Sequence, residues 1–293
     1  MDERNGLAAR FEEQRGKLRA VAYRMLGSLD EADDAVQEAW LRLSRVDADH
    51  LDNLAGWLRT VVTRICLDIL RSRRSRPEDL TEQQVLDAVS DSTQGNLPEG
   101  EALLADSVSR ALLVVLDRLG PAERIAFVLH DMFAVPFDQI APIVERTPVA
   151  TKKLASRARH KVQGTPVAPT AELARRRQVA SAFLAASRTG DLTAVLAVLA
   201  PDVVRRADPA AVPPGGAAEV RGARGVAEGT VVLARRSQLA ELALVNGDVG
   251  VIVAPRGQLL LALTFTIEDD KIAGYEVIAD PARLQRLDLA VLN

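Results

Sequence analysis

The chain has few of the residues that disulfide-stapled or metal-bound proteins depend on. Its 293 residues include one cysteine, Cys66, and three histidines, His50, His130 and His160. A single cysteine cannot close an internal disulfide, and histidines so far apart form no metal-binding motif. We therefore expect no disulfide framework, no metal site and no bound cofactor.

Long hydrophobic runs are also missing. No apolar stretch approaches the roughly 18 residues that cross a bilayer, and the first ten residues lack the cationic start and apolar core of a secretory signal. We expect a cytoplasmic protein with no membrane segment. Hydrophobic residues still make up 48% of the chain and charged residues 26%, which are the proportions of a folded globular protein.

Charge is distributed unevenly, although the formal net charge is only −3. Residues 29–38 hold five acids and no base, whereas residues 59–76 hold six arginines and one acid. Residues 77–106 hold eight acids and no base, and residues 146–161 hold six bases and no acid. Binding follows local patches rather than the total charge, so an acidic protein of this kind can still bind nucleic acid.

These shifts in composition divide the chain into three domains. We expect a helical domain at 1–77, an acidic linker rich in turn-forming residues at 78–105, and a second helical domain at 106–163. A proline-rich linker at 164–172 then leads to a third domain at 173–293, as a chain of this length usually forms two or three domains.

Apolar residues of the first domain follow three helical patterns. One stripe covers 11–26 and breaks at Gly27, and Asp30 can cap the helix that follows. A third pattern at 54–74 carries arginines on its outer side. A solvated helix face would explain any one of these arginines, but a cluster of them beside Trp57 is typical of phosphate contact.

The second domain has the pattern of a helix-turn-helix, with helices at 137–144 and 148–162 around a turn at 145–147. Thr147 is a suitable N-cap, and Pro148 is a favoured first helical residue. The start of the last helix is the place where such motifs contact base edges. A small helical bundle with a basic surface is the alternative interpretation.

Helical spacing predicts which side chains of the last helix face inward. The residues expected to be buried are Val149, Leu154, Ala158 and Val162. The residues expected to face outward are Ala150, Thr151, Lys152, Lys153, Ser156, Arg157, Arg159 and His160.

Three segments together resemble one protein family. Residues 33–43 read DDAVQEAWLRL and resemble the polymerase-binding helix of the extracytoplasmic-function (ECF) branch of sigma-70 factors. Residues 56–71 read GWLRTVVTRICLDILR and are similar to the promoter-melting helix of that family. The segment from GPAER at 120–124 to RAR at 157–159 is similar to its second conserved region, so the resemblance covers about residues 7–163.

The resemblance implies a sigma factor that binds core RNA polymerase and promoter DNA and initiates transcription. Candidate contacts to core polymerase are Asp33, Asp34, Gln37, Glu38 and Arg42. Candidate contacts to the melted non-template strand of the minus-ten element are Asn53, Trp57, Thr60, Arg64, Arg71, Arg73 and Arg74. Candidate contacts to the duplex minus-thirty-five element are Thr147, Thr151, Lys152, Lys153, Ser156, Arg157 and Arg159.

The third domain reads as helices followed by strands. Helices are expected at 175–187, 191–199 and 222–236, and strands at 239–245, 249–254, 259–267 and 272–278. Asn246-Gly247 is a strong hairpin turn. We expect an α+β domain with a curved antiparallel sheet, which is similar to the SnoaL-like cone that sigma factors of the sigma-J-like group carry at the same end.

We expect this third domain to regulate the sigma domains through intramolecular contact, because it is a neutral appendage with an apolar sheet on a short linker. The domain holds no histidine, so we expect no catalysis and no catalytic residues. A ligand-responsive helix-turn-helix transcriptional regulator is the alternative function. The acidic segment at 33–43 favours the sigma factor, because a simple regulator has no use for a polymerase-docking helix.

Overall fold

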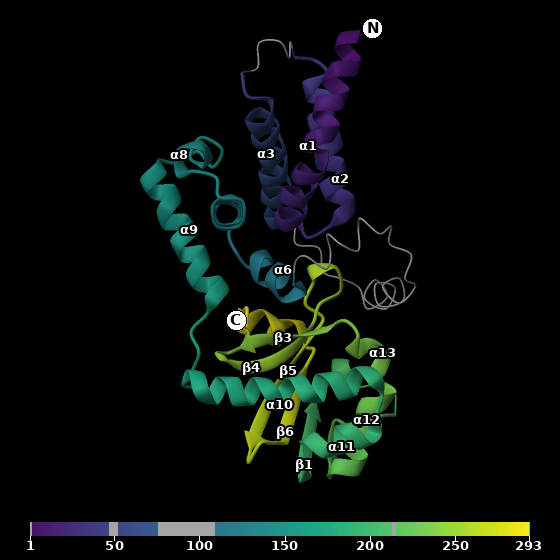
Figure 1. Cartoon of the computed structure of the whole chain (residues 1–293). Coiled ribbons are helices and arrows are strands. Elements are labelled where there is room, and N and C mark those ends of the chain that lie inside the picture. Colours follow the sequence, from purple (N-terminus) through teal and green to yellow (C-terminus); the bar gives the residue numbers. More distant parts are fainter. Residues whose placement is uncertain (1, 47–51, 76–108, 213–214, 293) are drawn as a thin grey trace. The chain divides into compact units, whose positions relative to one another are not determined.

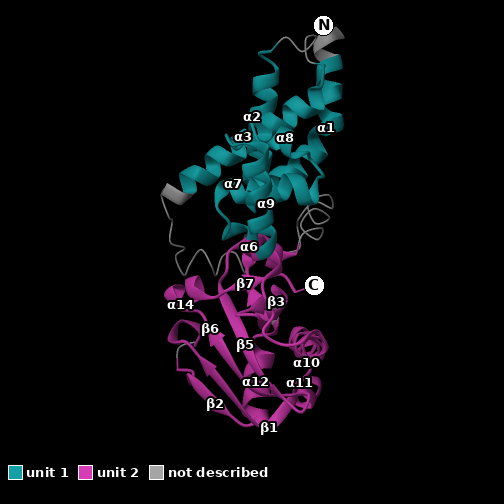
Figure 2. Ribbon diagram, turned by 90° about the vertical axis from the view of Figure 1, so that its left-hand side faces the viewer, with its two compact units in different colours: residues 1–79, 97–108, 116–160 teal, residues 80–96, 109–115, 161–293 magenta. Residues whose placement is uncertain are grey.

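The computed structural model describes residues 2–46, 52–75, 109–212 and 215–292 and separates into two compact units (Figure 2). Unit 1 contains the described residues up to 75 together with 116–160, and unit 2 contains 109–115 and the described residues from 161 onward. The predicted acidic linker at 78–105 lies outside the described residues. None of the described helices has both the length and the apolar character that crossing a bilayer requires.

The first part of unit 1 is built from three helices, α1 (Asp2–Leu26), α2 (Leu29–Leu43) and α3 (Leu54–Ser75) (Figure 1). Gly27 ends α1 with a φ of 75°, in the left-handed region that glycine adopts easily. Ser28 is the N-cap of α2, and its hydroxyl oxygen accepts a hydrogen bond from the Glu31 N–H at 3.4 Å. The prediction that Asp30 caps this helix was wrong, because Asp30 already lies inside the first turn.

Small and branched side chains bring these three helices together. The residues buried between them include Ala22, Met25, Ala32, Ala35, Leu58 and Val62, all at most 3% exposed. Alanines at the contact let the backbones approach closely, and the buried leucine, valine and methionine fill the remaining space. The outer faces of α2 and α3 are thereby fixed toward solvent.

The second part of unit 1 contains α7 (Pro121–Phe127), a π-helical continuation η2 (Val128–Met132), α8 (Phe137–Ile140) and most of α9 (Pro148–Gln163). The predicted helix at 137–144 ends early, at Ile140. Pro142 explains the difference, because a proline lacks the N–H that a continuing helix needs and its ring clashes with the preceding turn. Helix α7 packs against α3, and η2 packs against α1.

The start of α9 matches the prediction from its capping residues. The Thr147 hydroxyl oxygen accepts a hydrogen bond from the Ala150 N–H at 3.2 Å, and Pro148 is the first helical residue. Glu145, with a φ of 56°, forms the sharp turn before it. Local chemistry therefore sets where this helix begins.

Unit 2 is built on one seven-stranded sheet with the order β2-β1-β6-β5-β4-β3-β7. The strands are β1 (Leu199–Ala207), β2 (Glu219–Arg221), β3 (Ala240–Val245), β4 (Asp248–Val253), β5 (Leu261–Glu268), β6 (Lys271–Ile278) and β7 (Leu289–Ala290). Strands β3 to β6 form the predicted antiparallel meander. The sheet also contains β1, a strand that the sequence did not predict and that pairs with β6 in parallel.

Helices cover one face of this sheet (Figure 1). They are α10 (Thr170–Thr189), α11 (Leu192–Val198), α12 (Ala223–Val232) and α13 (Ala234–Ser237), with α14 (Pro281–Arg286) after the last long strand. The rings of Phe183, Phe265 and Tyr275 meet between helices and sheet, with centroids 5.5–6.1 Å apart. This is the helix-on-sheet α+β architecture that the sequence predicts, with a curved open sheet.

The turn between β3 and β4 also holds the proline-rich segment that precedes α10. Asn246 and Gly247 have φ values of 53° and 80°, which the predicted two-residue hairpin turn requires. The carbonyl of Gly247 accepts a hydrogen bond from the Val167 N–H at 2.9 Å. A Cβ at Gly247 would lie 2.7 Å from the carbonyl oxygen of Thr165, so only glycine fits this approach.

Candidate polymerase and nucleic-acid interfaces

Helix α2 presents an acidic outer face. Asp34 and Gln37 are exposed, whereas Asp33 pairs with Arg19 at 2.7 Å and Glu38 pairs with Arg42 at 2.9 Å along the helix. All five candidate polymerase contacts therefore lie on the solvent side of α2. The opposite side is buried in the helical core of unit 1.

A groove with a partly apolar floor lies beside that acidic face. It encloses about 200 Å³ between α1 and α2. Its lining consists of Ala8, Phe11, Glu12, Arg15, Asp33, Val36, Gln37 and Trp40. The Phe11 and Trp40 rings lie 5.0 Å apart between their centroids and form the floor. Carboxylates around an aromatic floor suit a partner helix that carries both basic and apolar side chains.

The start of α3 holds three of the candidate minus-ten contacts in fixed positions. The side chain of Asn53 is exposed, and its Oδ1 accepts a hydrogen bond from the Gly56 N–H at 2.8 Å. The Thr60 hydroxyl donates to the Gly56 carbonyl at 2.9 Å, and Trp57 is half-buried. Asn53 caps α3 and is therefore partly engaged in holding the helix start.

The arginines of α3 differ in what they contact. Arg64 is exposed, and Arg71 is paired with Glu145 at 3.5 Å. Arg73 donates to the Leu26 carbonyl at 2.9 Å and pairs with Glu31, so it joins α3 to the start of α2. The side chain of Arg74 lies outside the described residues.

A further arginine of α3 contacts the helix-turn-helix inside unit 1. Arg59 donates from Nη2 to Oε1 of Gln139 in α8 at 2.9 Å, and Arg71 reaches Glu145 in the turn before α9. The predicted minus-ten helix and the predicted minus-thirty-five motif are therefore in direct contact. The sequence contains no signal for these pairs, because their members lie 74 to 80 positions apart.

Unit 1 also contains a buried cation that the sequence did not reveal. The Arg124 side chain is 2% exposed, and its Nη1 lies 3.1 Å from Oδ1 of Asp117, a residue that is itself 61% exposed. Burial lowers the pKa of Arg124, and the charge of Asp117 opposes that shift. Burial likewise raises the pKa of Cys66 to about 12, so its thiol stays protonated and unreactive at neutral pH.

Helix α9 presents a cationic outer stripe with two surprises. Lys152, Lys153, Ser156, Arg157 and His160 are exposed as predicted, and Thr147 is exposed before the helix. Thr151 was predicted to face outward, but it is fully buried and its hydroxyl donates to the Thr147 carbonyl at 2.9 Å. Val149 was predicted to be buried, but it is 68% exposed.

The physical reason lies in the inner stripe of α9, which is made of small residues. Thr151, Ala155 and Ala158 are fully buried at helical spacing, and Val162 continues the same line. Small side chains let α9 pack closely, and this register turns Val149 outward. In this conformation Thr151 is out of reach of base edges.

Two arginines in the C-terminal half of α9 pair with carboxylates elsewhere in unit 1. Arg159 donates from Nε to Oδ1 of Asp131 at 2.7 Å, and Arg157 lies 3.7 Å from Oε1 of Glu123. The side chain of Arg157 remains 64% exposed, so it can still face a phosphate. Arg159 is more enclosed and anchors α9 to η2.

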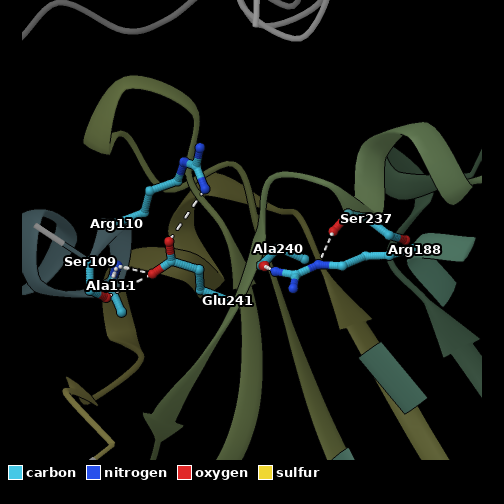
Figure 3. Close-up of polar contacts among 7 residues, drawn as sticks. All are labelled: Ser109, Arg110, Ala111, Arg188, Ser237, Ala240 and Glu241. Atoms are coloured by element: carbon cyan, nitrogen blue, oxygen red, sulfur yellow. Dashed lines mark hydrogen bonds and ion pairs between the residues drawn. The ribbon is translucent and has the colours of Figure 1, made fainter. Parts of the chain in front are cut away.

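In unit 2, Glu241 of β3 accepts hydrogen bonds from the start of α6 (Arg110–Asp117) (Figure 3). Its carboxylate receives the Ser109 hydroxyl at 2.7 Å, the Ala111 N–H at 3.1 Å and Nη1 of Arg110 at 3.3 Å. The first N–H groups of a helix have no partner within the helix, so this carboxylate satisfies one of them. Residues 109–115 thereby belong to unit 2, while 116–117 belong to unit 1.

Arg188 of α10 fixes the start of β3, the strand that carries Glu241. Arg188 of α10 donates from Nε to the Ser237 carbonyl at 3.2 Å and from Nη2 to the Ala240 carbonyl (Figure 3). Both acceptors lie just before or at the start of β3. Glu241 is therefore held on a strand whose first residue is itself fixed.

Asp208, another acidic residue of unit 2, has a structural role. Asp208 accepts hydrogen bonds from the Ala279 and Asp280 N–H groups, each at 3.0 Å, and pairs with Arg283. Burial alone would raise the pKa of Asp208, but these hydrogen bonds and the Arg283 charge outweigh it and lower the pKa. A carboxylate so fully bonded ties β1 to the end of β6.

Comparison with known proteins finds relatives among sigma factors. The family model described as sigma-70 region 2 matches residues 11–76. A probable ECF RNA polymerase sigma factor, SigI of Mycobacterium tuberculosis, is 35% identical over 98% of this chain and 98% of its own length.

The ECF RNA polymerase sigma factor SigJ of the same organism is 36% identical over 92% of this chain and 91% of its own length. The crystal structure of SigJ aligns with 95% of this chain and 98% of its own, with 32% identity and a TM-score of 0.47. Relatives of this identity span nearly the whole of both chains, and the chain therefore belongs to the ECF family of RNA polymerase sigma factors.

Proposed function

We propose that this sigma factor docks on core RNA polymerase through the outer face of α2, holds the melted minus-ten strand along α3, and reads the minus-thirty-five duplex with α9. As a sigma factor it is a transcription initiation factor rather than an enzyme. Membership of the ECF family does not favour the alternative of a ligand-responsive regulator. The observation that carries the proposal is the presence of three separate charged faces, one acidic and two basic, on the helices that the family resemblance assigns to these roles.

The acidic face of α2 supports the polymerase contact. Asp34 and Gln37 point to solvent beside a groove with an aromatic floor, so a basic amphipathic helix could bind both features together. We expect Asp34→Lys to weaken binding to purified core polymerase at least tenfold, because it places a cation opposite a basic partner. Asp202→Lys, at an exposed position of unit 2, is the matched control and should bind as the wild type does. Equal binding by both variants would contradict this docking face.

The contact between α3 and α8 supports a rearrangement on promoter binding. The two promoter elements lie about 25 base pairs apart, which is roughly 85 Å of duplex at about 3.4 Å per base pair. Arg59 and Gln139 are only 2.9 Å apart, so both elements cannot be read at once in the described conformation. We infer that the helix-turn-helix leaves α3 when polymerase and promoter bind.

Fluorescence energy transfer tests that separation directly. Dyes can be placed on cysteines introduced at Ser72 and His160, which are both exposed, because the native Cys66 is buried and stays protonated. We expect high transfer in the free chain and a marked fall when core polymerase and promoter are added. Unchanged transfer in an active complex would contradict the inference.

The third domain is proposed to modulate this activity through Glu241. Residues 109–115 begin the segment assigned to the second sigma domain, yet they are held on β3 by the carboxylate of Glu241. Release of that carboxylate would free the start of α6 and change how the following helices are positioned. The support is that this one carboxylate accepts hydrogen bonds from three groups at the start of α6, where the Ser109 hydroxyl also accepts from the Ala111 N–H at 3.1 Å.

A single substitution in the full chain tests this modulation. Glu241→Ala removes all three hydrogen bonds, and we expect promoter-dependent transcription to change several-fold. The sign of the change tells whether the third domain activates or restrains the sigma domains. Glu228→Ala, which removes only an exposed pair with Arg224, is the matched control. If Glu241→Ala transcribes as the control does, this contact has no regulatory role.

A further inference from the structure

The outer stripe of α9 combines one apolar side chain with several cations. Val149 is 68% exposed at the second position of the helix. Lys152 and Lys153 follow one turn later, and Ser156 and Arg157 one turn after that, all exposed. These residues share one face, because positions three and four apart on a helix are neighbours.

An exposed valine alone would carry no meaning, because single apolar residues are common on protein surfaces. Val149 differs in its position and in its rigidity. The Thr147 cap fixes the first turn of α9, and a β-branched side chain has one strongly preferred rotamer in a helix. Its two methyl groups are therefore held out from the first turn of α9, on the same face as the cations.

The duplex feature that matches such a side chain is the methyl group of thymine. Residues in the N-terminal turn of a recognition helix meet base edges in the major groove. The thymine C5-methyl is the apolar group that the major groove displays, and aliphatic side chains contact it directly. Lysines one turn away can reach phosphates or guanine edges on either side.

We propose that Val149 is a specificity-determining residue that selects a thymine in the minus-thirty-five element by contact with its methyl group. This inference rests on the proposed function of α9 as the reader of that element. Val149 lies about one helical turn, roughly 6 Å, from Lys153 on the same face, which corresponds to about two base-pair steps. The selected thymine therefore lies within about two base pairs of the position that Lys153 approaches.

Selection from a random pool can locate the thymine. The probe is a set of linear duplexes with randomised minus-thirty-five and minus-ten segments, bound by the full chain together with core polymerase and then sequenced. We expect the wild type to enrich a thymine at one position of the upstream segment. We expect Val149→Ala to lose that preference while keeping the rest of the selected sequence.

Replacement of thymine by deoxyuridine then isolates the methyl group. Deoxyuridine keeps every hydrogen bond of thymine and removes only the C5-methyl. At one thymine of the selected duplex, the replacement should weaken wild-type binding about three- to fivefold, the effect of one buried apolar carbon. The same replacement should not affect Val149→Ala.

The control is Val232→Ala, which removes the same two methyl groups from an 82% exposed valine of α12. It should select the same sequence and show the same deoxyuridine sensitivity as the wild type. If wild type and Val149→Ala respond equally to deoxyuridine at every thymine, or if no thymine is sensitive, the role of Val149 is refuted while promoter reading by α9 stands. If the wild type enriches no sequence in the upstream segment, the proposed function of α9 fails, and the role of Val149 fails with it.

Discussion

The buried pair of Arg124 and Asp117 leads to an asymmetric prediction for the stability of unit 1. The Arg124 guanidinium has been taken out of water, whereas the Asp117 carboxylate remains largely hydrated. Asp117→Asn leaves a buried cation with no countercharge at that contact. Arg124→Met removes the buried charge, keeps most of the side-chain volume, and leaves a carboxylate that water can solvate.

The expected size follows from how buried each partner is. Breaking a fully buried ion pair costs about 3–5 kcal/mol, and losing an exposed pair costs about 0–1 kcal/mol. Since Asp117 is 61% exposed and Arg124 is 2% exposed, we expect Asp117→Asn to cost about 2 kcal/mol, between these limits. That corresponds to a fall in Tm of about 4–8 °C. We expect Arg124→Met to lie within about 1 kcal/mol of the wild type.

Tryptophan fluorescence makes the measurement specific to unit 1, because both tryptophans of the chain, Trp40 and Trp57, belong to that unit. Thermal unfolding would be followed for the wild type, both single variants and the double variant. Asp68→Asn, at a 74% exposed carboxylate, is the control and should have little effect. A cost of Asp117→Asn that persists in the Arg124→Met background would refute the reasoning, as would Arg124→Met being the more destabilising variant.

Three further perturbations test particular features of the fold. Gly247→Ala should destabilise unit 2 by about 1–3 kcal/mol in chemical denaturation, because the new side chain combines a positive φ with a backbone clash. Gly229→Ala, at a position of α12 with open space around it, is the control and should not destabilise unit 2. The pKa of Asp208 is lower in the folded chain than in the unfolded chain, where it is about 3.9, so the ionised carboxylate stabilises the fold at pH values above about 3.9. This stabilisation is lost as the pH falls through the lower folded pKa. Asp208→Asn should therefore lower the free energy of unfolding at neutral pH and weaken its dependence on pH below about pH 4. The same pH dependence as the wild type in that range would contradict this role of Asp208. Ser28→Ala should cost about 1 kcal/mol in thermal unfolding of unit 1 through loss of the α2 cap, and no change in Tm would contradict that role.

Features set by local chemistry could be predicted from the sequence. The Asn246-Gly247 turn follows from the ease with which these residues adopt a positive φ, and the start of α9 follows from Thr147 and Pro148. The strands β3 to β6 follow from their alternation and turn signals. Each of these depends on residues within a few positions of one another.

Features set by distant packing could not be predicted. The parallel pairing of β1 with β6 joins residues about 70 positions apart, and α11 runs directly into β1 without a turn signal. The contact of Glu241 with Ser109 spans 132 positions. The predicted inner face of α9 was wrong for another reason. The side of α9 that packs inside unit 1 is made of small side chains, so Thr151 is buried and the larger Val149 is not.

Run-off transcription tests the central claim most directly. Purified core polymerase would be supplied with genomic promoter fragments, with or without the full chain. The account predicts a promoter-specific transcript that requires the added chain and that falls sharply with Asp34→Lys but not with Asp202→Lys. Absence of any transcript, together with absence of binding to core polymerase, would contradict the assignment of this chain as a working sigma factor.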